Sequence, residues 1–383
     1  MLIPRIIIVD IDMQKFLVFA GTRPEAIKVA PVVHELRARA GTQVILVSSG
    51  QHKELLTQTL ADFNLKPDID LCVMRPNQDL GGLTARLFAS ITELLEKERP
   101  HWVLVQGDTT TVFAAATCAF YRGCPVGHIE AGLRSFDMRA PFPEEFNRRV
   151  ASLVADLHFA PTEKARQNLL NEHIQEDRIF VTGNTVIDSL LWMRNQAGVG
   201  AALLPESVRS ALDSGKRLLL MTGHRRENHG LGFEHICQAI TDLVQQHTDM
   251  IVVYPVHPNP NVRKPIQERL SGQGRILLLD PLEYKSFIAL LDAAHIVLTD
   301  SGGIQEEAPA LGKPVLVLRD VTERPEGVEA GTARLVGTLP DTIVREVTQL
   351  WTSQDAYARM AHAINPYGDG QAAKRIVDTL LEC

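Results

Sequence analysis

The sequence contains no long apolar run and few cysteines, and these absences narrow the class of protein. No apolar stretch approaches the roughly 18 residues that a membrane-spanning helix requires. The five cysteines are scattered without a CxxC pair, and their odd number provides no disulfide framework. We therefore expect a cytoplasmic protein with no membrane partner.

The chain also lacks an excess of basic residues. Its formal net charge is −7, which argues against a general nucleic-acid binder, so we expect no nucleic-acid partner. Apolar residues make up 45% and charged residues 22%, as in an ordinary globular protein. At 383 residues the chain exceeds one typical core, which predicts two domains.

Cofactor and metal motifs are missing at the places where they would be expected. The first strand-to-helix turn, Gly21–Glu25, is neither a GxGxxG fingerprint nor a Walker loop. No HxH or HExxH spacing accompanies His224, the histidine of a later strand end. We therefore expect no metal, NAD or other cofactor.

What the chain does contain is a regular alternation of short β-rich apolar runs and amphipathic segments. Such alternation predicts parallel sheets with helices on both faces. The expected fold class is α/β, with two doubly wound, Rossmann-like domains and a ligand cleft between the carboxyl ends of their sheets. The predicted strands are Phe16–Ala20, Val44–Ser48, Trp102–Gln106, Val126–Ile129, Leu157–Ala160, Arg217–Thr222, Ile251–Tyr254, Ile276–Leu279, Ile296–Thr299 and Val315–Leu318.

The predicted domain boundaries follow from the same pattern. A stretch rich in Gly, Ala, Ser and Pro around Gln196–Gly215 separates the strands into two groups and is expected to mark the domain boundary. We expect an N-terminal extension at 1–12, an N-terminal domain at 13–195 and a C-terminal domain at 196–368. Residues 369–383 are expected to form a helix that packs back on the first domain.

Two polar runs follow apolar strands in the first half. Arg23 stands near a helix N-terminus, where anions are stabilised, and Lys28 follows it on that helix. A solvated arginine in an ordinary turn explains this run equally well. Asp108 follows the strand at 102–106, and helix capping by Asp and Thr is the simpler alternative there.

More carboxylates follow in the same half. Glu130 ends the next strand, and Glu144 begins a helix preceded by Pro143. Glu144 shares a helix face with Arg148, which a surface ion pair would also explain. Because the carboxyl ends of neighbouring parallel strands meet in one crevice, Asp108, Glu130 and Glu144 are candidates for acid–base chemistry.

The second half offers groups suited to an anion. His224 is followed by two arginines at a strand end, which suits a diphosphate, although a structural histidine stays open as an alternative. Another strand is followed by Ser-Gly-Gly at 301–303 and a helix, which is the pattern of a phosphate cradle. Glu307 lies one turn later, where it can accept hydrogen bonds from ribose hydroxyls, and Arg324 is expected to add positive charge nearby.

Together these runs closely resemble the non-hydrolysing UDP-N-acetylglucosamine 2-epimerase family. The resemblance extends from about Lys15 to the C-terminus. The motifs that carry it, in the family's order, are GTRPEAIK, GDTTT, HIEAGLRS, PFPEEFNRR, TGNTVIDSLL, TGHRREN, YPVHPNPNVR, LTDSGGIQEEAP, GKPVLVLRD, TERPEG and NPYGDGQA.

The resemblance implies a fold like that of GT-B glycosyltransferases and reversible C2 epimerisation of UDP-N-acetylglucosamine to UDP-N-acetylmannosamine for bacterial surface polysaccharides. UDP would be eliminated to give a 2-acetamidoglucal and then added back. A homodimer is also implied. The residues in catalytic positions are Asp108, Glu130, Glu144 and His224. Those in substrate-binding positions are Arg23, Lys28, Arg148, Ser301, Gly302, Gly303, Glu307 and Arg324.

The resemblance also implies an activating site for a second UDP-N-acetylglucosamine, at Gln51, His52 and Gln78. Asn77 and Gln106 depart from the residues expected of the family at those positions. Three other functions stay open on the sequence: a GT-B glycosyltransferase, a hydrolysing relative that releases free N-acetylmannosamine, and a non-catalytic UDP-sugar sensor.

Overall fold

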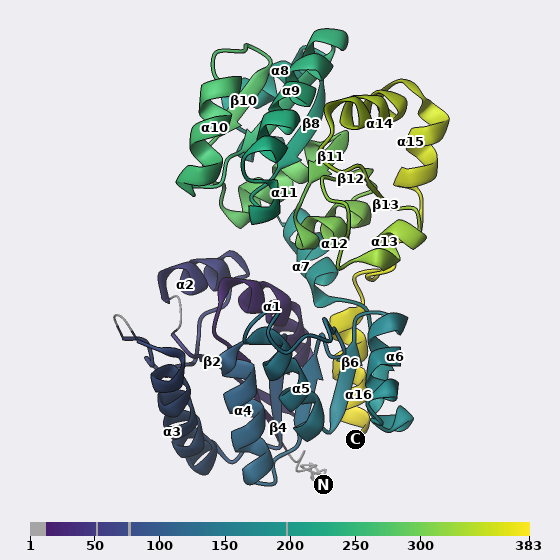
Figure 1. Ribbon diagram of the computed structural model, residues 1–383. Helices are drawn as coiled ribbons and strands as arrows, with labels where there is room; N and C mark the ends of the chain where they lie inside the picture. Colours follow the sequence, from purple (N-terminus) through teal and green to yellow (C-terminus); the bar gives the residue numbers. More distant parts are fainter. Residues whose placement is uncertain (1–12, 51–52, 76–77, 197) are drawn as a thin grey trace, which may run out of the picture. The chain divides into compact units, whose positions relative to one another are not determined.

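A computed structural model describes residues 13–50, 53–75, 78–196 and 198–383 (Figure 1). The chain divides into two compact units. Unit 1 comprises Met1–Thr185 and Gln371–Cys383, and unit 2 comprises Val186–Gly370. The functional division into a carboxylate domain and a UDP-binding domain stays a prediction.

Unit 1 contains a seven-stranded parallel sheet in the order β3-β2-β1-β4-β5-β6-β7. The strands are β1 (Gln14–Ala20), β2 (Thr42–Ser48), β3 (Ile69–Asp70), β4 (Trp102–Gln106), β5 (Val126–Ile129), β6 (Leu157–Ala160) and β7 (Ile179–Val181). The centre of β1, from Phe16 to Ala20, is buried at every residue. A continuous apolar run of this kind fits a parallel strand that is covered on both faces.

The helices of unit 1 are α1 (Arg23–Ala38), α2 (Lys53–Asp62), α3 (Leu80–Glu98), α4 (Thr110–Tyr121), α5 (Glu144–Val154), α6 (Glu163–Asn171) and α16 (Ala372–Glu382). Figure 1 shows α16, in yellow, among the elements of unit 1. It packs beside α1, and Arg39 at the end of α1 forms an ion pair with Asp378 at 2.5 Å. The last residues of the chain therefore complete the first unit.

Unit 2 contains a six-stranded parallel sheet in the order β10-β9-β8-β11-β12-β13. The strands are β8 (Arg217–Thr222), β9 (Met250–Pro255), β10 (Ile276–Leu279), β11 (Ile296–Thr299), β12 (Val315–Val317) and β13 (Ala333–Leu335). The helices are α7 (Thr185–Arg194), α8 (Glu206–Asp213), α9 (Leu231–Gln246), α10 (Pro260–Leu270), α11 (Tyr284–Ala293), α12 (Gly302–Ala310), α13 (Pro325–Glu329), α14 (Pro340–Thr352) and α15 (Gln354–Ala361).

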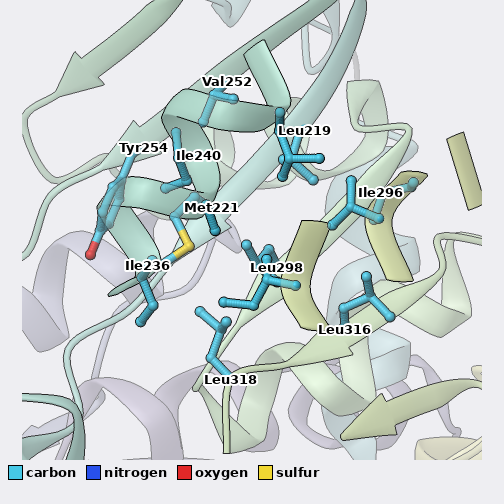
Figure 2. Close-up of a cluster of buried hydrophobic side chains, with 14 of the residues drawn as sticks. Leu219, Met221, Ile236, Ile240, Val252, Tyr254, Ile296, Leu298, Leu316 and Leu318 are labelled. Carbon is cyan, nitrogen blue, oxygen red and sulfur yellow. The ribbon is translucent and has the colours of Figure 1, made fainter. Parts of the chain in front are cut away.

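The core of unit 2 lies between one face of this sheet and the helices that cover it (Figure 2). Alternate residues of the central strands point into it, as the period of two in a strand requires. Burying one leucine, isoleucine or valine side chain contributes about 1.5–3 kcal/mol relative to leaving it exposed. The core extends to the carboxyl end of the sheet, where the Tyr254 hydroxyl donates to the carbonyl oxygen of Gly223 at 2.9 Å.

All ten predicted strands lie within or match observed strands, apart from a difference of one residue at the end of β12. Three short strands at or near the sheet edges, β3, β7 and β13, were not predicted. The stretch Gln196–Gly215, expected to mark the domain boundary, lies within unit 2, which begins at Val186. It contains α8, which buries Val208. No helix in the described part of the chain combines the length and apolar character needed to cross a bilayer.

Candidate functional site

In unit 1 the predicted residues lie at the carboxyl ends of three adjacent strands. Because β4 lies between β1 and β5, its following loop with Asp108 lies between the turn containing Arg23 and the residue Glu130. The topology therefore brings these segments to one edge of the sheet, although Arg23 and Glu130 are more than a hundred residues apart in the chain.

Glu130 is held by donors on both carboxylate oxygens. Lys28 Nζ donates to Oε1 at 2.5 Å, and Asn184 Nδ2 donates to the same oxygen at 3.0 Å. Gln106 Nε2 donates to Oε2. The backbone of Glu130 has φ +64°, a conformation that non-glycine residues adopt rarely and often at functional positions. The side chain is thus fixed in one orientation beside a cation.

Asp108 lies against Arg148 of α5. Arg148 donates to Asp108 Oδ2 from Nη2 at 2.6 Å and from Nε at 3.0 Å, and it also donates to Glu145 at 3.1 Å. The N-cap of α4 is Thr109, whose hydroxyl accepts from the amide of Val112, so capping does not account for Asp108. Arg148 therefore orients Asp108 rather than forming the surface pair with Glu144.

Glu144 differs from these two carboxylates. It is the first residue of α5, and its Oε2 is buried without a hydrogen-bond partner among the described residues. Buried polar atoms are normally paired, so an oxygen of this kind indicates a position that a ligand or water completes.

Arg23 begins α1 and is partly buried, and the described residues provide no hydrogen bond or ion pair to its guanidinium. Two residues later, Glu25 is buried and accepts hydrogen bonds from three donors. Burial raises the pKa of Glu25 to about 7, against the opposing effect of these hydrogen bonds. Sequence reasoning missed Glu25, although Thr22 and Glu25 form the T-x-x-E pattern of a helix start.

Two histidines were also missed in unit 1. His128 of β5 is buried and bonds through Nε2 to the carbonyl oxygen of Gly107 at 2.8 Å, which supports the loop carrying Asp108. Burial lowers the pKa of His128 to about 4. His158, which is paired with His128 on the adjacent strand β6, is also buried, and burial lowers the pKa of His158 to about 3. Both imidazoles are therefore neutral at physiological pH.

In unit 2 the fully buried carboxylate of Asp300 organises the loop that follows β8. It accepts from the backbone amides of His224 at 3.0 Å and Arg225 at 2.9 Å, and from Asn228 Nδ2 at 3.1 Å. The sequence placed Asp300 in a motif but gave it no role. Its partners lie more than seventy residues away in the chain, so no local pattern identifies them.

His224 lies at the surface of this loop. Its ring stacks on His257 with centroids 5.4 Å apart, and its Nδ1 is 3.6 Å from an Asp300 oxygen. Partial burial lowers the pKa of His224, while the Asp300 carboxylate opposes that shift. Because the ring is exposed on one side, it is available to a ligand rather than enclosed as a core histidine.

The Ser-Gly-Gly segment predicted to form a cradle lies at the start of α12. Ser301 is the N-cap residue, and its side chain makes no capping hydrogen bond. A Cβ added at Gly303 would meet nothing within 4 Å, and at Gly302 its nearest neighbour would be Arg225 Nη2 at 3.8 Å. The first turn of the helix thus borders open space, as an anion site at a helix N-terminus requires.

The two other predicted residues of unit 2 already have partners within the protein. Glu307 is buried, and the Tyr284 hydroxyl donates to its Oε1 at 3.5 Å. Arg324 forms an ion pair with the buried Glu306. The positive charge expected from Arg324 is therefore balanced by a neighbouring carboxylate.

The predicted activating site is described only in part. Gln51 and His52 lie outside the described residues. Gln78 Oε1 accepts from the amide of Arg75 at 3.1 Å and from the guanidinium of Arg86. Among the described residues, no group of three or more His, Cys, Asp or Glu side chains is arranged to hold a metal ion.

Known proteins resemble this chain over nearly its whole length. The family model for UDP-N-acetylglucosamine 2-epimerase matches residues 34–381. The UDP-N-acetylglucosamine 2-epimerase of Escherichia coli K12 is 50% identical over 368 residues, with 96% of this chain and 98% of the relative covered. A probable UDP-N-acetylglucosamine 2-epimerase of Ralstonia solanacearum is 52% identical over 371 residues, covering 95% and 98% of the two chains.

Solved structures confirm the predicted fold class of two parallel α/β sheets in a GT-B-like fold. A putative epimerase of this kind from Listeria monocytogenes matches with a TM-score of 0.90 at 44% identity, covering 96% of each chain. The Neisseria meningitidis enzyme, solved bound to UDP-GlcNAc, gives 0.83 at 47% identity, covering 97% of this chain and 100% of its own. The glycosyltransferase of kitacinnamycin, at 13% identity and a TM-score of 0.64 over 97% and 98%, shares the fold alone. This chain belongs to the UDP-N-acetylglucosamine 2-epimerase family.

Proposed function

We propose that this chain, an isomerase by its family, reversibly inverts C2 of UDP-N-acetylglucosamine to give UDP-N-acetylmannosamine. The observation that carries the proposal is the set of carboxylates at adjacent strand ends of unit 1, together with the open anion cradle of unit 2. The UDP-GlcNAc bound to the Neisseria meningitidis relative supports the choice of substrate.

The reaction begins with removal of the proton on C2 while UDP leaves C1, which gives a 2-acetamidoglucal. UDP then adds back to C1 as a proton is delivered to C2 from the opposite face. The C2 proton is only weakly acidic, so a base must act together with stabilisation of the departing diphosphate. Because the configuration inverts, acid–base groups are needed on both faces of the sugar, which requires more than one carboxylate.

The three carboxylates provide two different environments for these steps. Asp108 and Glu130 are each oriented by a cation, Arg148 and Lys28 respectively, whereas one oxygen of Glu144 has no partner among the described residues. We assign proton transfer at C2 to this set. Precise orientation of the acting groups is the protein's contribution here, since a misplaced base loses much of its effect.

The remaining groups bind UDP. Ser301, Gly302 and Gly303 donate from the helix start, and His224 lies at the diphosphate in a loop that Asp300 holds in place. Arg23 contributes a guanidinium with no partner among the described residues. In unit 2, Glu307 accepts from the ribose and Arg324 lies nearby. In unit 1, Lys28 and Arg148 contribute further substrate-binding cations. Holding UDP between the two steps allows it to add back.

A homodimer and a regulatory site complete the proposal. Three large apolar side chains are 56–77% exposed: Phe120 and Tyr121 at the C-terminal end of α4, and Leu153 on α5. Their exposure supports an interface between copies of the chain. We also propose that a second UDP-N-acetylglucosamine acts as activator at Gln78, with Gln51 and His52. The product would serve surface polysaccharide synthesis in the cytoplasm.

Incubation with UDP-N-acetylglucosamine in the absence of an acceptor tests the function against its alternatives. NMR of the products should show UDP-N-acetylmannosamine accumulating to equilibrium. Free N-acetylmannosamine with UDP would instead identify a hydrolysing enzyme. Unchanged substrate would favour a glycosyltransferase or a sensor, and would contradict the proposed isomerase.

A further inference from the structure

Glu25 joins two loops that carry proposed site residues. Its Oε2 accepts from the amide of Gly21 at 3.1 Å and from the hydroxyl of Thr22 at 2.7 Å, both in the turn that leads to Arg23. Its Oε1 accepts from the hydroxyl of Thr109 at 2.8 Å, across 84 residues of chain. One buried carboxylate is therefore shared by the turn after β1 and the loop after β4.

Through its bond to Thr109, Glu25 is connected to the residue that directly follows Asp108. Thr109 is the N-cap of α4, so its hydroxyl both donates to Glu25 and accepts from the amide of Val112. The start of α4, and with it the backbone of Asp108, is thereby fixed relative to the start of α1. A helix cap alone would need only the local bonds within residues 21–25.

Steric contacts make this junction tight. A Cβ added at Gly21 would lie 2.5 Å from the hydroxyl of Thr111 and 2.6 Å from that of Ser49, and these two hydroxyls are hydrogen-bonded at 3.0 Å. Segments following β1, β2 and β4 thus meet around Gly21 with Glu25 beside them. Displacing one of them moves the others, because close-packed interiors transmit small shifts.

We propose that Glu25 is a positioning residue for the reaction, which holds the Asp108 loop and the Arg23 turn in the register that proton transfer at C2 requires. Glu25 does not touch the sugar, and it acts through Asp108. The proposal rests on the proposed function, in which Asp108 takes part in the proton transfer.

A double-mutant cycle between Glu25→Gln and Asp108→Asn tests this role. The amide keeps the volume of Glu25 but turns an NH2 group toward one of the three donors. At pH 8, kcat should fall about tenfold in Glu25→Gln, with KM within about threefold of wild type and UDP binding still stoichiometric. In the Asp108→Asn background, the same change should lower kcat by less than about threefold.

The matched control is Glu163→Gln. Glu163 is also a first-turn glutamate behind a threonine N-cap in unit 1, but it is 70% exposed and pairs with Arg166 at the surface. It should leave kcat unchanged in both backgrounds. If Glu25→Gln does not fold, Thr109→Val, which removes the donor to Oε1, takes its place in the cycle with the same expected coupling.

Three results overturn the proposal. An unchanged kcat, or an equal tenfold loss in both backgrounds, would show that Glu25 does not act through Asp108, and would leave the proposed function intact. Near-normal turnover in Asp108→Asn would remove the catalytic role on which the proposal rests. Failure of wild type to form UDP-N-acetylmannosamine would refute the proposed function itself, so the separate failures are distinguishable.

Discussion

The buried Glu25 makes the stability of unit 1 depend on pH in a direction that a single substitution reveals. Burial raises its pKa from the ordinary 4.5 to about 7 in the folded protein. The native state therefore holds this proton more tightly than the unfolded chain. Below about pH 4.5 Glu25 is protonated in both states, so it costs the folded protein nothing relative to a neutral side chain. As pH rises from there to about 7, the free energy of unfolding falls.

The size of the effect follows from the same two values. A pKa difference between 4.5 and about 7 corresponds to about 3 kcal/mol, because each pH unit contributes 1.36 kcal/mol. Glu25→Gln removes the ionisation. The free energy of unfolding of the variant minus that of wild type should therefore rise by about 3 kcal/mol between pH 4.5 and pH 8.

Hydrogen exchange of the buried β1 amides in urea, at a series of pH values, reports this difference for unit 1 alone. The histidines His128 and His158 titrate in the opposite direction: their pKa values of about 4 and about 3 make both proteins less stable as pH falls below 6.5. Because both proteins contain them, their contribution cancels in the difference. A difference that stays flat with pH, or falls as pH rises, would refute the reasoning.

Four other substitutions test the proposed carboxylates, the cradle and one buried ion pair. Asp108→Asn and Glu130→Gln should each lower kcat, measured by steady-state kinetics, by roughly two orders of magnitude or more, with UDP affinity by calorimetry retained. Near-normal turnover in both variants would exclude these carboxylates from the mechanism. Gly303→Ala should leave Tm within about 2 °C, since its Cβ meets nothing, but weaken UDP binding about tenfold; unchanged affinity would argue against the cradle. Arg134→Met removes the fully buried bidentate partner of Glu172, which still has Arg149 at 3.6 Å. The variant should cost about 1.5–3 kcal/mol in urea unfolding, and a loss under about 0.5 kcal/mol would contradict a structural role.

The sequence was sufficient to predict the central strands, because their apolar runs and the polar residues that end them are local signals. The edge strands β3, β7 and β13 were not predictable in this way, since two or three residues carry no measurable period. The helix α8 was missed because it is only eight residues long and lies in a segment whose composition resembles a linker.

Site residues were predictable where a motif contained them, but their partners were not. Nothing near Glu130 in the chain identifies Asn184 as a donor, and nothing near Asp300 indicates that it holds the loop of His224. These bonds depend on which strand ends are adjacent, a property of the folded sheet. Glu25 is intermediate, because the local T-x-x-E pattern indicates its bonds to the turn but not its bond to Thr109.

Deuterium exchange at C2 tests the central claim most directly. Wild-type protein incubated with UDP-N-acetylglucosamine in deuterated water should give both UDP-sugars, with deuterium at C2 of the UDP-N-acetylmannosamine formed. Asp108→Asn and Glu130→Gln should incorporate deuterium at least about a hundredfold more slowly. UDP-N-acetylmannosamine that retains the original hydrogen at C2 would contradict inversion through proton transfer by these carboxylates.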